Sequence, residues 1–194
     1  MLEYIKGTVS ELTPTYVVLE VAQIGYFIHI SLNTYASLEG KEAATLYIHE
    51  VIREDAHTLY GFTDREERQL FLLLISVSGI GTNTARMILS SFSVSELENI
   101  IASDNVNQLK AVKGIGLKTA QRVIIDLKDK VRKGITADLS IPGMKVNANK
   151  EEALSALVML GFNQAASAKV IDKIVVEQPD LSLEKIIKEA LKRM

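Results

Sequence analysis

One short pattern occurs twice in this chain of 194 residues and limits what the chain can fold into. The segments SVSGIGTNTARMILSSF (residues 76–92) and AVKGIGLKTAQRVIIDL (residues 111–127) align without a gap, 35 residues apart. In each copy, two glycines bracket one isoleucine immediately before a stretch with helical periodicity. Because glycine costs roughly 1 kcal/mol inside a helix, both glycine pairs should lie in a turn before it. The repeat therefore predicts two copies of one supersecondary unit.

The repeated turns have the chemistry of phosphate-binding sites. Glycine lets another molecule approach the main chain, and the N–H groups at a helix start lack partners and sit at the positive end of the helix dipole. The isoleucines, Ile80 and Ile115, should point inward and lock each turn onto its flanking helices. Lys118 falls in the first turn of the second helix, where a base is useful beside a phosphate. The predicted donors are the glycines of both turns, Gly79, Gly81, Gly114 and Gly116.

Other interpretations of the glycine pairs are weaker. A dinucleotide-binding fingerprint needs a third glycine, where Thr84 and Thr119 stand, and a strand before the turn. A P-loop needs lysine directly after its second glycine, but Leu117 follows Gly116. Two tight turns without any ligand remain an alternative, which the duplication and the adjacent bases make less favourable. Contacts to phosphates alone would read the shape of a nucleic acid and not its sequence.

The charge distribution also favours a nucleic-acid partner. The net charge of −2 conceals an uneven spread, since residues 1–62 hold 3 Lys+Arg against 8 Asp+Glu, while residues 63–136 hold 11 against 8. Residues 110–133, around the second turn, hold 8 bases and only 2 acids. The chain has no cysteine, which excludes disulfides and thiolate metal sites. It has no apolar run long enough to span a bilayer and no secretory signal, so we expect a cytoplasmic protein.

The periodicity divides the chain into four parts and predicts a multidomain α+β fold. Residues 1–62 contain five short β-branched segments separated by turn signals, among them GYFIHISL (residues 25–32), which favours a small barrel of the oligonucleotide-binding type, although another β-meander fits the pattern too. Residues 63–136 are helical and carry the repeat. Residues 137–148 gather Gly, Pro and Asn and are typical of a linker. Residues 149–194 predict a three-helix domain with little core, more suited to binding than to catalysis.

The whole arrangement resembles the RuvA family of Holliday junction branch migration subunits. The most specific segments are VIREDAHTLYGF (residues 51–62), the pair SGIGTNTA and KGIGLKTA, and ALVMLGFNQAASA (residues 156–168). The resemblance implies an OB-fold barrel, two helix-hairpin-helix motifs and a C-terminal three-helix domain similar to ubiquitin-associated domains. It also implies a homotetramer, or two tetramers, that binds a four-way DNA junction and recruits a RuvB-type hexameric ATPase, with a RuvC-type resolvase as a further partner.

The resemblance assigns roles to particular residues. An acidic pin falls on Glu54 and Asp55, whose carboxylates would repel phosphates at the centre of the junction; without the resemblance they are ordinary turn residues. The DNA contacts fall on both hairpins, with Asn83 standing where many relatives carry lysine, and comprise Gly79, Ile80, Gly81, Asn83, Arg86, Gly114, Ile115, Gly116, Lys118 and Arg122. The contact with the motor falls on Leu157, Leu160 and Phe162, for which packing in the core of the small domain is an equal alternative.

No catalytic arrangement is apparent in the sequence. His29, His49 and His57 lie in strand-like segments without ligand spacing, and Glu66 and Glu67 fit the solvated face of a helix. We therefore expect a non-catalytic subunit without a cofactor or metal of its own, whose partner uses ATP and Mg²⁺. A DNA-binding subunit of a structure-selective nuclease is the alternative, since paired helix-hairpin-helix units also occur in such enzymes. A protein-interaction scaffold that binds no DNA is a third.

Overall fold

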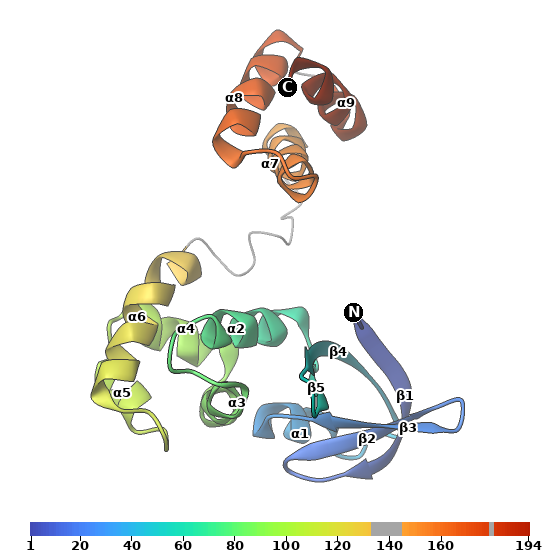
Figure 1. Ribbon diagram of the computed structural model, residues 1–194, viewed down its shortest axis with the longest axis vertical. Coiled ribbons are helices and arrows are strands. Elements are labelled where there is room, and N and C mark those ends of the chain that lie inside the picture. Colours follow the sequence, from blue (N-terminus) through green and yellow to red (C-terminus); the bar gives the residue numbers. More distant parts are fainter. Residues whose placement is uncertain (133–144, 179–180) are drawn as a thin grey trace. The chain divides into compact units, whose positions relative to one another are not determined.

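The computed structural model describes residues 1–132, 145–178 and 181–194, coloured along the chain in Figure 1. The chain forms two compact units, Met1–Ala137 and Asp138–Met194. None of the helices in the described ranges combines the length and apolar character that a membrane span requires.

The first unit begins with a closed five-stranded barrel, so the predicted barrel, and not an open meander, is confirmed. Alternation of apolar and polar residues places one face of each strand inside, as for Val17, Leu19 and Ile28, none of which is exposed to solvent. The strands hydrogen-bond in the order β1-β2-β3-β5-β4, with β1 against β4 closing the barrel and β3 parallel to β5. Their bounds are β1 (Tyr4–Leu12), β2 (Tyr16–Val21), β3 (Ile24–His29), β4 (Ala43–Ile52) and β5 (His57–Phe62).

One helix of the barrel was not predicted. α1 (Leu32–Leu38) follows β3, where the sequence pattern had suggested that a strand continued to Leu32. β3 ends at His29, and Ser31 begins the helix, because its side chain accepts a hydrogen bond from the N–H of Thr34 and caps the helix. Ser31 was therefore the signal for a helix start in the sequence. It was overlooked because the apolar run before it has the pattern of a strand.

Five helices complete the first unit and share one core with the end of the barrel. Tyr60 and Phe62 of β5 pack in the same buried cluster as Phe71 and the apolar faces of the helices. Because this cluster extends across the predicted boundary at residues 62 and 63, the barrel and the helices form one unit in this structure. The helices are α2 (Arg65–Ile75), α3 (Thr82–Ser91), α4 (Val94–Ala102), α5 (Val106–Lys110) and α6 (Leu117–Arg132).

The second unit is a three-helix domain, as predicted, formed by α7 (Lys145–Met159), α8 (Gln164–Glu177) and α9 (Leu183–Arg193). Its core is small and contains Ala153, Leu157, Ile171, Ile174, Ile186 and Ala190. Most of the predicted linker, residues 137–148, lies outside the described residues. Its last four residues, 145–148, form the first turn of α7, because nothing after Gly143 in the sequence stops a helix.

Candidate nucleic-acid interface

The two glycine turns share one backbone geometry. Gly79 and Gly114 have φ angles of 94° and 90°, in the left-handed region that other residues rarely adopt. The isoleucine that follows each of them donates its N–H to the valine carbonyl three residues earlier, at 3.0 Å in the first copy and 3.1 Å in the second. The duplication in the sequence is therefore a duplication in structure, and each copy is a helix-hairpin-helix unit.

Each hairpin has a buried isoleucine and exposed glycines. Ile80 and Ile115 are each only 5% exposed and anchor their turns in the core, as predicted. Gly81 occupies the N-cap of α3, where no side chain satisfies the N–H groups of the first turn. Gly81 and Asn83 are exposed, so N–H groups of this turn that lack a capping side chain can bond an external acceptor. A phosphate oxygen is such an acceptor.

The two hairpins lie close together, and one hydrogen bond joins them. A Cβ atom at Gly79 would lie 4.0 Å from Oγ1 of Thr119 in α6, and a Cβ atom at Gly114 would lie 3.6 Å from Cε of Met87 in α3. The Arg122 guanidinium of α6 donates to the Ser78 carbonyl of the first hairpin at 3.4 Å. Sequence reasoning missed this arrangement, although Met87 and Arg122 are equivalent positions of the repeat.

Basic side chains surround the second hairpin. Lys110, Lys113 and Lys118 are exposed, and Arg122 is exposed beside both hairpins. Lys128, further along α6, instead forms an ion pair with Asp104. Asn83 is exposed in the first turn of α3, where it offers an amide in place of a charge. The positive potential is therefore concentrated at the second hairpin and at Arg122, which reaches toward the first.

Arg86 has a contact that the sequence did not predict. Its guanidinium Nη1 donates to the Thr15 carbonyl of the barrel at 3.0 Å and to Nδ1 of His29 at 3.1 Å. Burial, with a smaller effect of Arg86, lowers the pKa of His29, which favours the neutral ring that can accept this bond. The expectation that Arg86 reaches outward to DNA therefore has to be corrected, because this nitrogen already joins α3 to the barrel.

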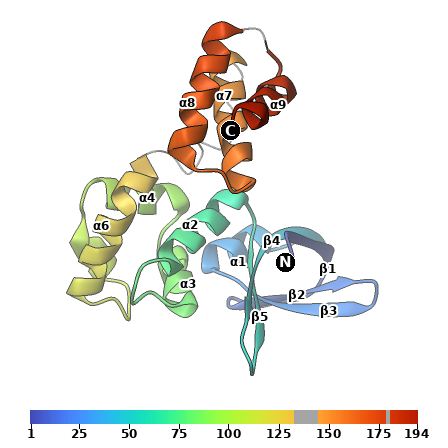
Figure 2. The same ribbon diagram turned by 45° about the horizontal axis from the view of Figure 1, so that its top comes forward.

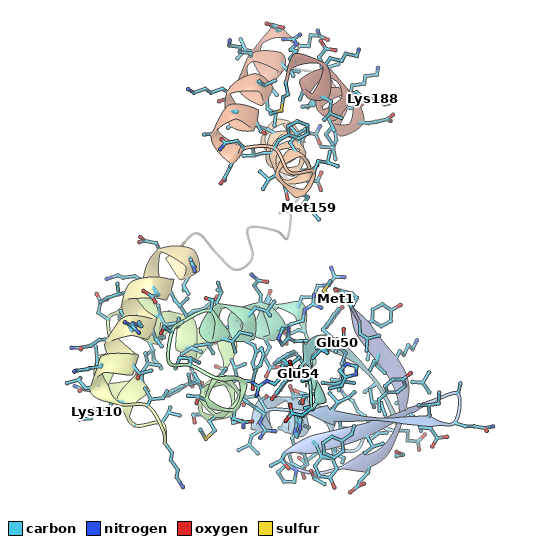
Figure 3. All side chains as sticks on the ribbon, viewed as in Figure 1. Met1, Glu50, Glu54, Lys110, Met159 and Lys188 are labelled. Atoms are coloured by element: carbon cyan, nitrogen blue, oxygen red, sulfur yellow. The ribbon has the colours of Figure 1, made fainter. Side chains whose placement is uncertain are left out.

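The predicted acidic pin is an exposed turn. Glu54 and Asp55 lie between β4 and β5 and are both exposed, while the N–H of Arg53 donates to the Ala56 carbonyl at 2.8 Å and closes the turn. Figure 2 shows this hairpin projecting beyond the rest of the barrel, and Figure 3 labels Glu54. Two carboxylates at the tip of a projecting hairpin form a local negative charge that no described side chain neutralises.

The predicted motor contacts in the second unit divide into two kinds. Leu157 is 0% exposed and packs in the core of the three-helix domain, so its prediction as a contact is wrong. Phe162 is partly buried and packs against the same core. Leu160 is 61% exposed and continues a patch with Val158 and Met159, the last of which is labelled in Figure 3 at the end of α7. Val158–Leu160 therefore form an exposed apolar patch at the end of α7.

The histidines belong to the barrel, as predicted. His57 Nε2 lies 2.9 Å from Oε1 of Glu50, and burial lowers the pKa of His49. Across the described ranges, no three His, Asp or Glu side chains converge in a way that could hold a metal ion. The features that remain as candidates for DNA contact are the two hairpins, their bases and the acidic turn.

Three protein families match successive parts of the chain. The RuvA N terminal domain matches residues 1–61, the SAM-like helix-hairpin-helix tandem matches residues 71–129, and the RuvA C-terminal domain matches residues 148–194. The matched ranges cover the barrel, the two hairpins and the three-helix domain in turn.

Similar proteins span the whole chain. A Bacteroides fragilis protein is 56% identical over 201 residues, and a Bacteroides thetaiotaomicron protein is 53% identical over 204 residues, with all of both chains covered in each case. A Christiangramia forsetii protein is 52% identical over 194 residues, again with full coverage. Each of these three proteins bears the name Holliday junction branch migration complex subunit RuvA.

Proposed function

This chain belongs to the RuvA family, and from that membership we propose that it binds four-way DNA junctions as a subunit of a branch migration complex. The observation that carries the proposal is the close approach of two hairpins of one backbone geometry, the first of which leaves the N–H groups of α3 without a capping side chain. Such a pair holds two phosphates of one DNA arm without reading bases. Four copies of the chain would hold the four arms of a junction.

The acidic turn supplies the preference for junctions in this proposal. In a homotetramer with its symmetry axis at the centre of the junction, four copies of Glu54 and Asp55 would meet where the strands cross. Their repulsion of phosphates keeps the centre open and separates the strands. A linear duplex offers no open centre, so the same carboxylates would oppose its binding. Two tetramers on opposite faces of the junction are the alternative assembly, and native mass measurement distinguishes them.

We assign the motor activity to a partner. The exposed patch Val158–Leu160 of the second unit is apolar and suits contact with a hexameric ATPase of the RuvB type. In this proposal the chain itself is non-catalytic, binds no cofactor and works in the cytoplasm, while the partner hydrolyses ATP with Mg²⁺. A RuvC-type resolvase would act on the junction that the complex holds.

The test is a gel-shift competition between a synthetic four-way junction and a linear duplex of equal length, with the purified full chain and no nucleotide. We expect a strong preference for the junction. Equal affinity for both would overturn the proposal and leave a general phosphate-binding protein. Incubation of the labelled junction with Mg²⁺ accompanies the test, because strand cleavage by the pure protein would instead identify a nuclease subunit.

A further inference from the structure

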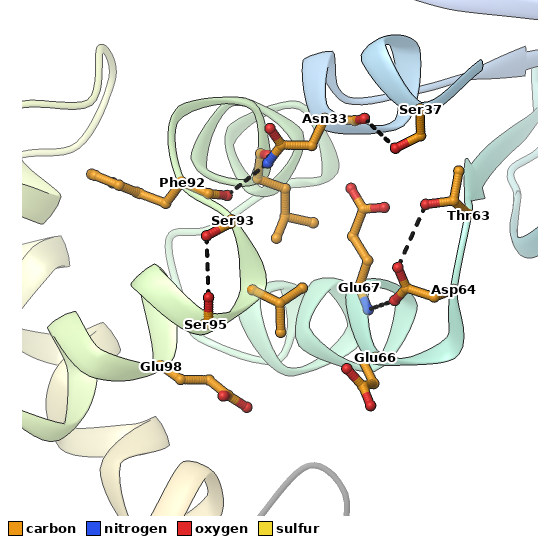
Figure 4. A pocket seen from close by; sticks show the side chains of 12 residues that line it. Asn33, Ser37, Thr63, Asp64, Glu66, Glu67, Phe92, Ser93, Ser95 and Glu98 are labelled. Carbon is orange, nitrogen blue, oxygen red and sulfur yellow. Dashed lines mark hydrogen bonds between the residues drawn. The ribbon is translucent and has the colours of Figure 1, made fainter. Parts of the chain in front are cut away.

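A seam of polar contacts joins the barrel to the helices that carry the first hairpin. Glu67 of α2 is 4% exposed and accepts hydrogen bonds from Oγ of Ser31 at 2.6 Å and from Oγ1 of Thr34 at 2.8 Å. Ser31 and Thr34 belong to the barrel side of the seam and are themselves buried. Sequence reasoning had placed Glu67 on a solvated helix face, which is wrong. Figure 4 shows its side chain rising from α2 toward α1.

One face of α3 forms the rest of the seam. Thr82, Arg86 and Ser90 are spaced four residues apart, so they lie on one side of the helix. Each contacts the barrel or α1: Thr82 Oγ1 accepts from the Tyr60 hydroxyl at 2.8 Å, Arg86 donates to the Thr15 carbonyl, and Ser90 Oγ accepts from the N–H of Leu32 at 3.0 Å.

Asn33 joins the far end of α3 to α1. Its Nδ2 donates to the carbonyls of Leu89 and Phe92 at 2.6 and 2.9 Å, near the end of the helix where carbonyls lack helical partners. Figure 4 draws the second of these bonds. Both ends of α3 are therefore tied to the barrel side of the unit.

Hydrogen bonds, and not packing alone, determine the geometry of this seam. A cavity of about 350 Å³ opens beside Glu67, with Asp64, Glu66 and Glu98 in its lining. A buried carboxylate is costly, and a well-packed apolar group in its place often gives equal or greater stability. Polar contacts of this kind are directional, so they fix an orientation that apolar packing next to a cavity leaves adjustable.

Only the first hairpin has this connection among the described residues. The positions of α6 equivalent to Thr82, Arg86 and Ser90 are Leu117, Gln121 and Ile125, and Leu117 and Ile125 are 50% and 76% exposed. The first hairpin is therefore tied to the barrel by hydrogen bonds, while the second is held by the helical core that contains Ile115.

The seam also provides a short path from the acidic turn to the first hairpin. Tyr60 lies on β5, the strand that leaves the turn containing Glu54 and Asp55. Its hydroxyl bonds Thr82, the first residue of α3 and the neighbour of Gly81. One strand and one hydrogen bond thus separate the repelling carboxylates from the phosphate-binding N–H groups.

We propose that Tyr60 and Glu67 are positioning residues that fix the acidic turn relative to the first hairpin, so that the preference for junctions over duplex depends on the seam. The inference rests on the proposed function, because it concerns the same site. A rotation of α3 against the barrel would leave the hairpins able to hold a duplex arm. It would displace the carboxylates from the centre of the junction.

The test compares Tyr60→Phe and Glu67→Gln with the wild-type full chain in binding to junction and duplex at one salt concentration. Loss of one hydrogen bond per protomer should lower the junction-to-duplex affinity ratio by about threefold to tenfold, with duplex affinity nearly unchanged. Ile100→Val, which trims a buried apolar side chain of α4 that makes none of the seam's hydrogen bonds, is the control for a comparable loss of stability. It should leave the ratio unchanged at an equal fall in melting temperature.

A double-mutant cycle connects the seam to the carboxylates. In a chain that already carries Glu54→Gln and Asp55→Asn, Tyr60→Phe should have no further effect on the ratio, since nothing remains to be positioned. An equal loss in the presence and absence of the carboxylates would overturn the inference, and so would a parallel loss of junction and duplex affinity. A wild-type chain without junction preference would instead overturn the proposed function.

Discussion

At the residue scale, the two positions of each glycine pair need glycine for different physical reasons. Gly114 has a φ of 90°, whereas Gly116 has no positive φ and no atom within 4 Å of an added Cβ. The first glycine is therefore required by the protein's own backbone. The second is not required by the folded chain, which leaves space there for a side chain. In the proposed function it is required by the phosphate that approaches the main chain from outside.

Alanine at each of these glycines should separate the two requirements. Gly114→Ala should lower the free energy of unfolding by about 1 kcal/mol or more, because alanine is strained at positive φ. Gly116→Ala should change it by less than about 0.5 kcal/mol and still weaken junction binding, because its Cβ would keep phosphates from the main chain. All six tyrosines lie in the first unit, so denaturation followed by tyrosine fluorescence measures its stability. Unchanged DNA binding by a fully folded Gly116→Ala would remove this hairpin from the interface.

The buried carboxylate of Glu67 predicts a pH dependence of stability. Burial raises the pKa of Glu67 above the ordinary 4.5, with Asp64 adding to the effect and the Ser31 and Thr34 hydroxyls opposing it. Between 4.5 and the raised pKa, the folded state holds a proton that the unfolded state has lost. The free energy of unfolding contributed by this group should therefore fall as pH rises through that window. Glu67→Gln should flatten this part of the profile in urea titrations followed by tyrosine fluorescence, and an unchanged profile would contradict the assignment.

Sequence reasoning located the hairpins because glycine and repetition are local signals. It predicted Gly79, Ile80 and their equivalents in the roles that the backbone gives them. It failed for Arg86 and Glu67, since a charged side chain on a helix shows no sign of which element will cover it. Their partners in the barrel are tens of residues away in the chain, so only the tertiary structure brings them together.

At the element scale, the repeat sets two similar helices in different surroundings. α3 is covered by the barrel through its polar face, while the equivalent face of α6 stays exposed with Leu117 and Ile125. The start of α4 is set by a local signal, a capping box of Ser93 with Glu96. Which face is covered could not be predicted from two sequences of the same periodicity.

α7 offers a matched pair of leucines for a test of the second unit. Leu157→Ala should lower the free energy of unfolding of this domain by about 2–5 kcal/mol, because the side chain is completely buried. Leu160→Ala should leave stability nearly unchanged and weaken binding to the hexameric ATPase, because Leu160 is 61% exposed. The domain contains no tyrosine, so its unfolding is followed by far-UV circular dichroism. Full motor binding by Leu160→Ala would exclude this residue from the contact.

At the scale of the whole molecule, the first unit carries charges of opposite sign in two separate places. Bases surround the second hairpin and acids occupy the β4–β5 turn, within a chain of net charge −2. The average charge therefore gives no indication of a DNA-binding protein, whereas its distribution does. Affinity should depend on salt through the bases and on DNA shape through the acids.

Lys118 should contribute to the salt dependence of binding. Each phosphate contact adds about −0.9 to the slope of log affinity against log salt, so Lys118→Ala should make the slope shallower by about 0.9 for each protomer in contact. Lys130→Ala removes the same charge from the same helix, roughly 18 Å further along it, and serves as the control. Equal slopes for wild type and Lys118→Ala would remove this lysine from the interface.

Neutral residues in the acidic turn should reduce the preference for the junction over linear duplex. Glu54→Gln with Asp55→Asn should strengthen binding to linear duplex more than binding to the junction, since repulsion is removed where a duplex would cross the centre. Glu20→Gln with Glu42→Gln removes two exposed acids elsewhere on the barrel and controls for net charge. An identical effect of the two double variants would mean that the position of the carboxylates is unimportant.

The fixed spacing of the hairpins has a consequence for the thermodynamics of recognition. Arg122 of α6 donates to the Ser78 carbonyl of the first hairpin, and Ile80 and Ile115 anchor both turns in one core. The distance between the two sets of N–H groups is therefore set when the chain folds, before any nucleic acid arrives. The entropy of ordering is lost during folding and not during association. Such a pair should bind with high affinity a backbone whose phosphate spacing fits this distance. It should bind more weakly a backbone that must be stretched or compressed to fit.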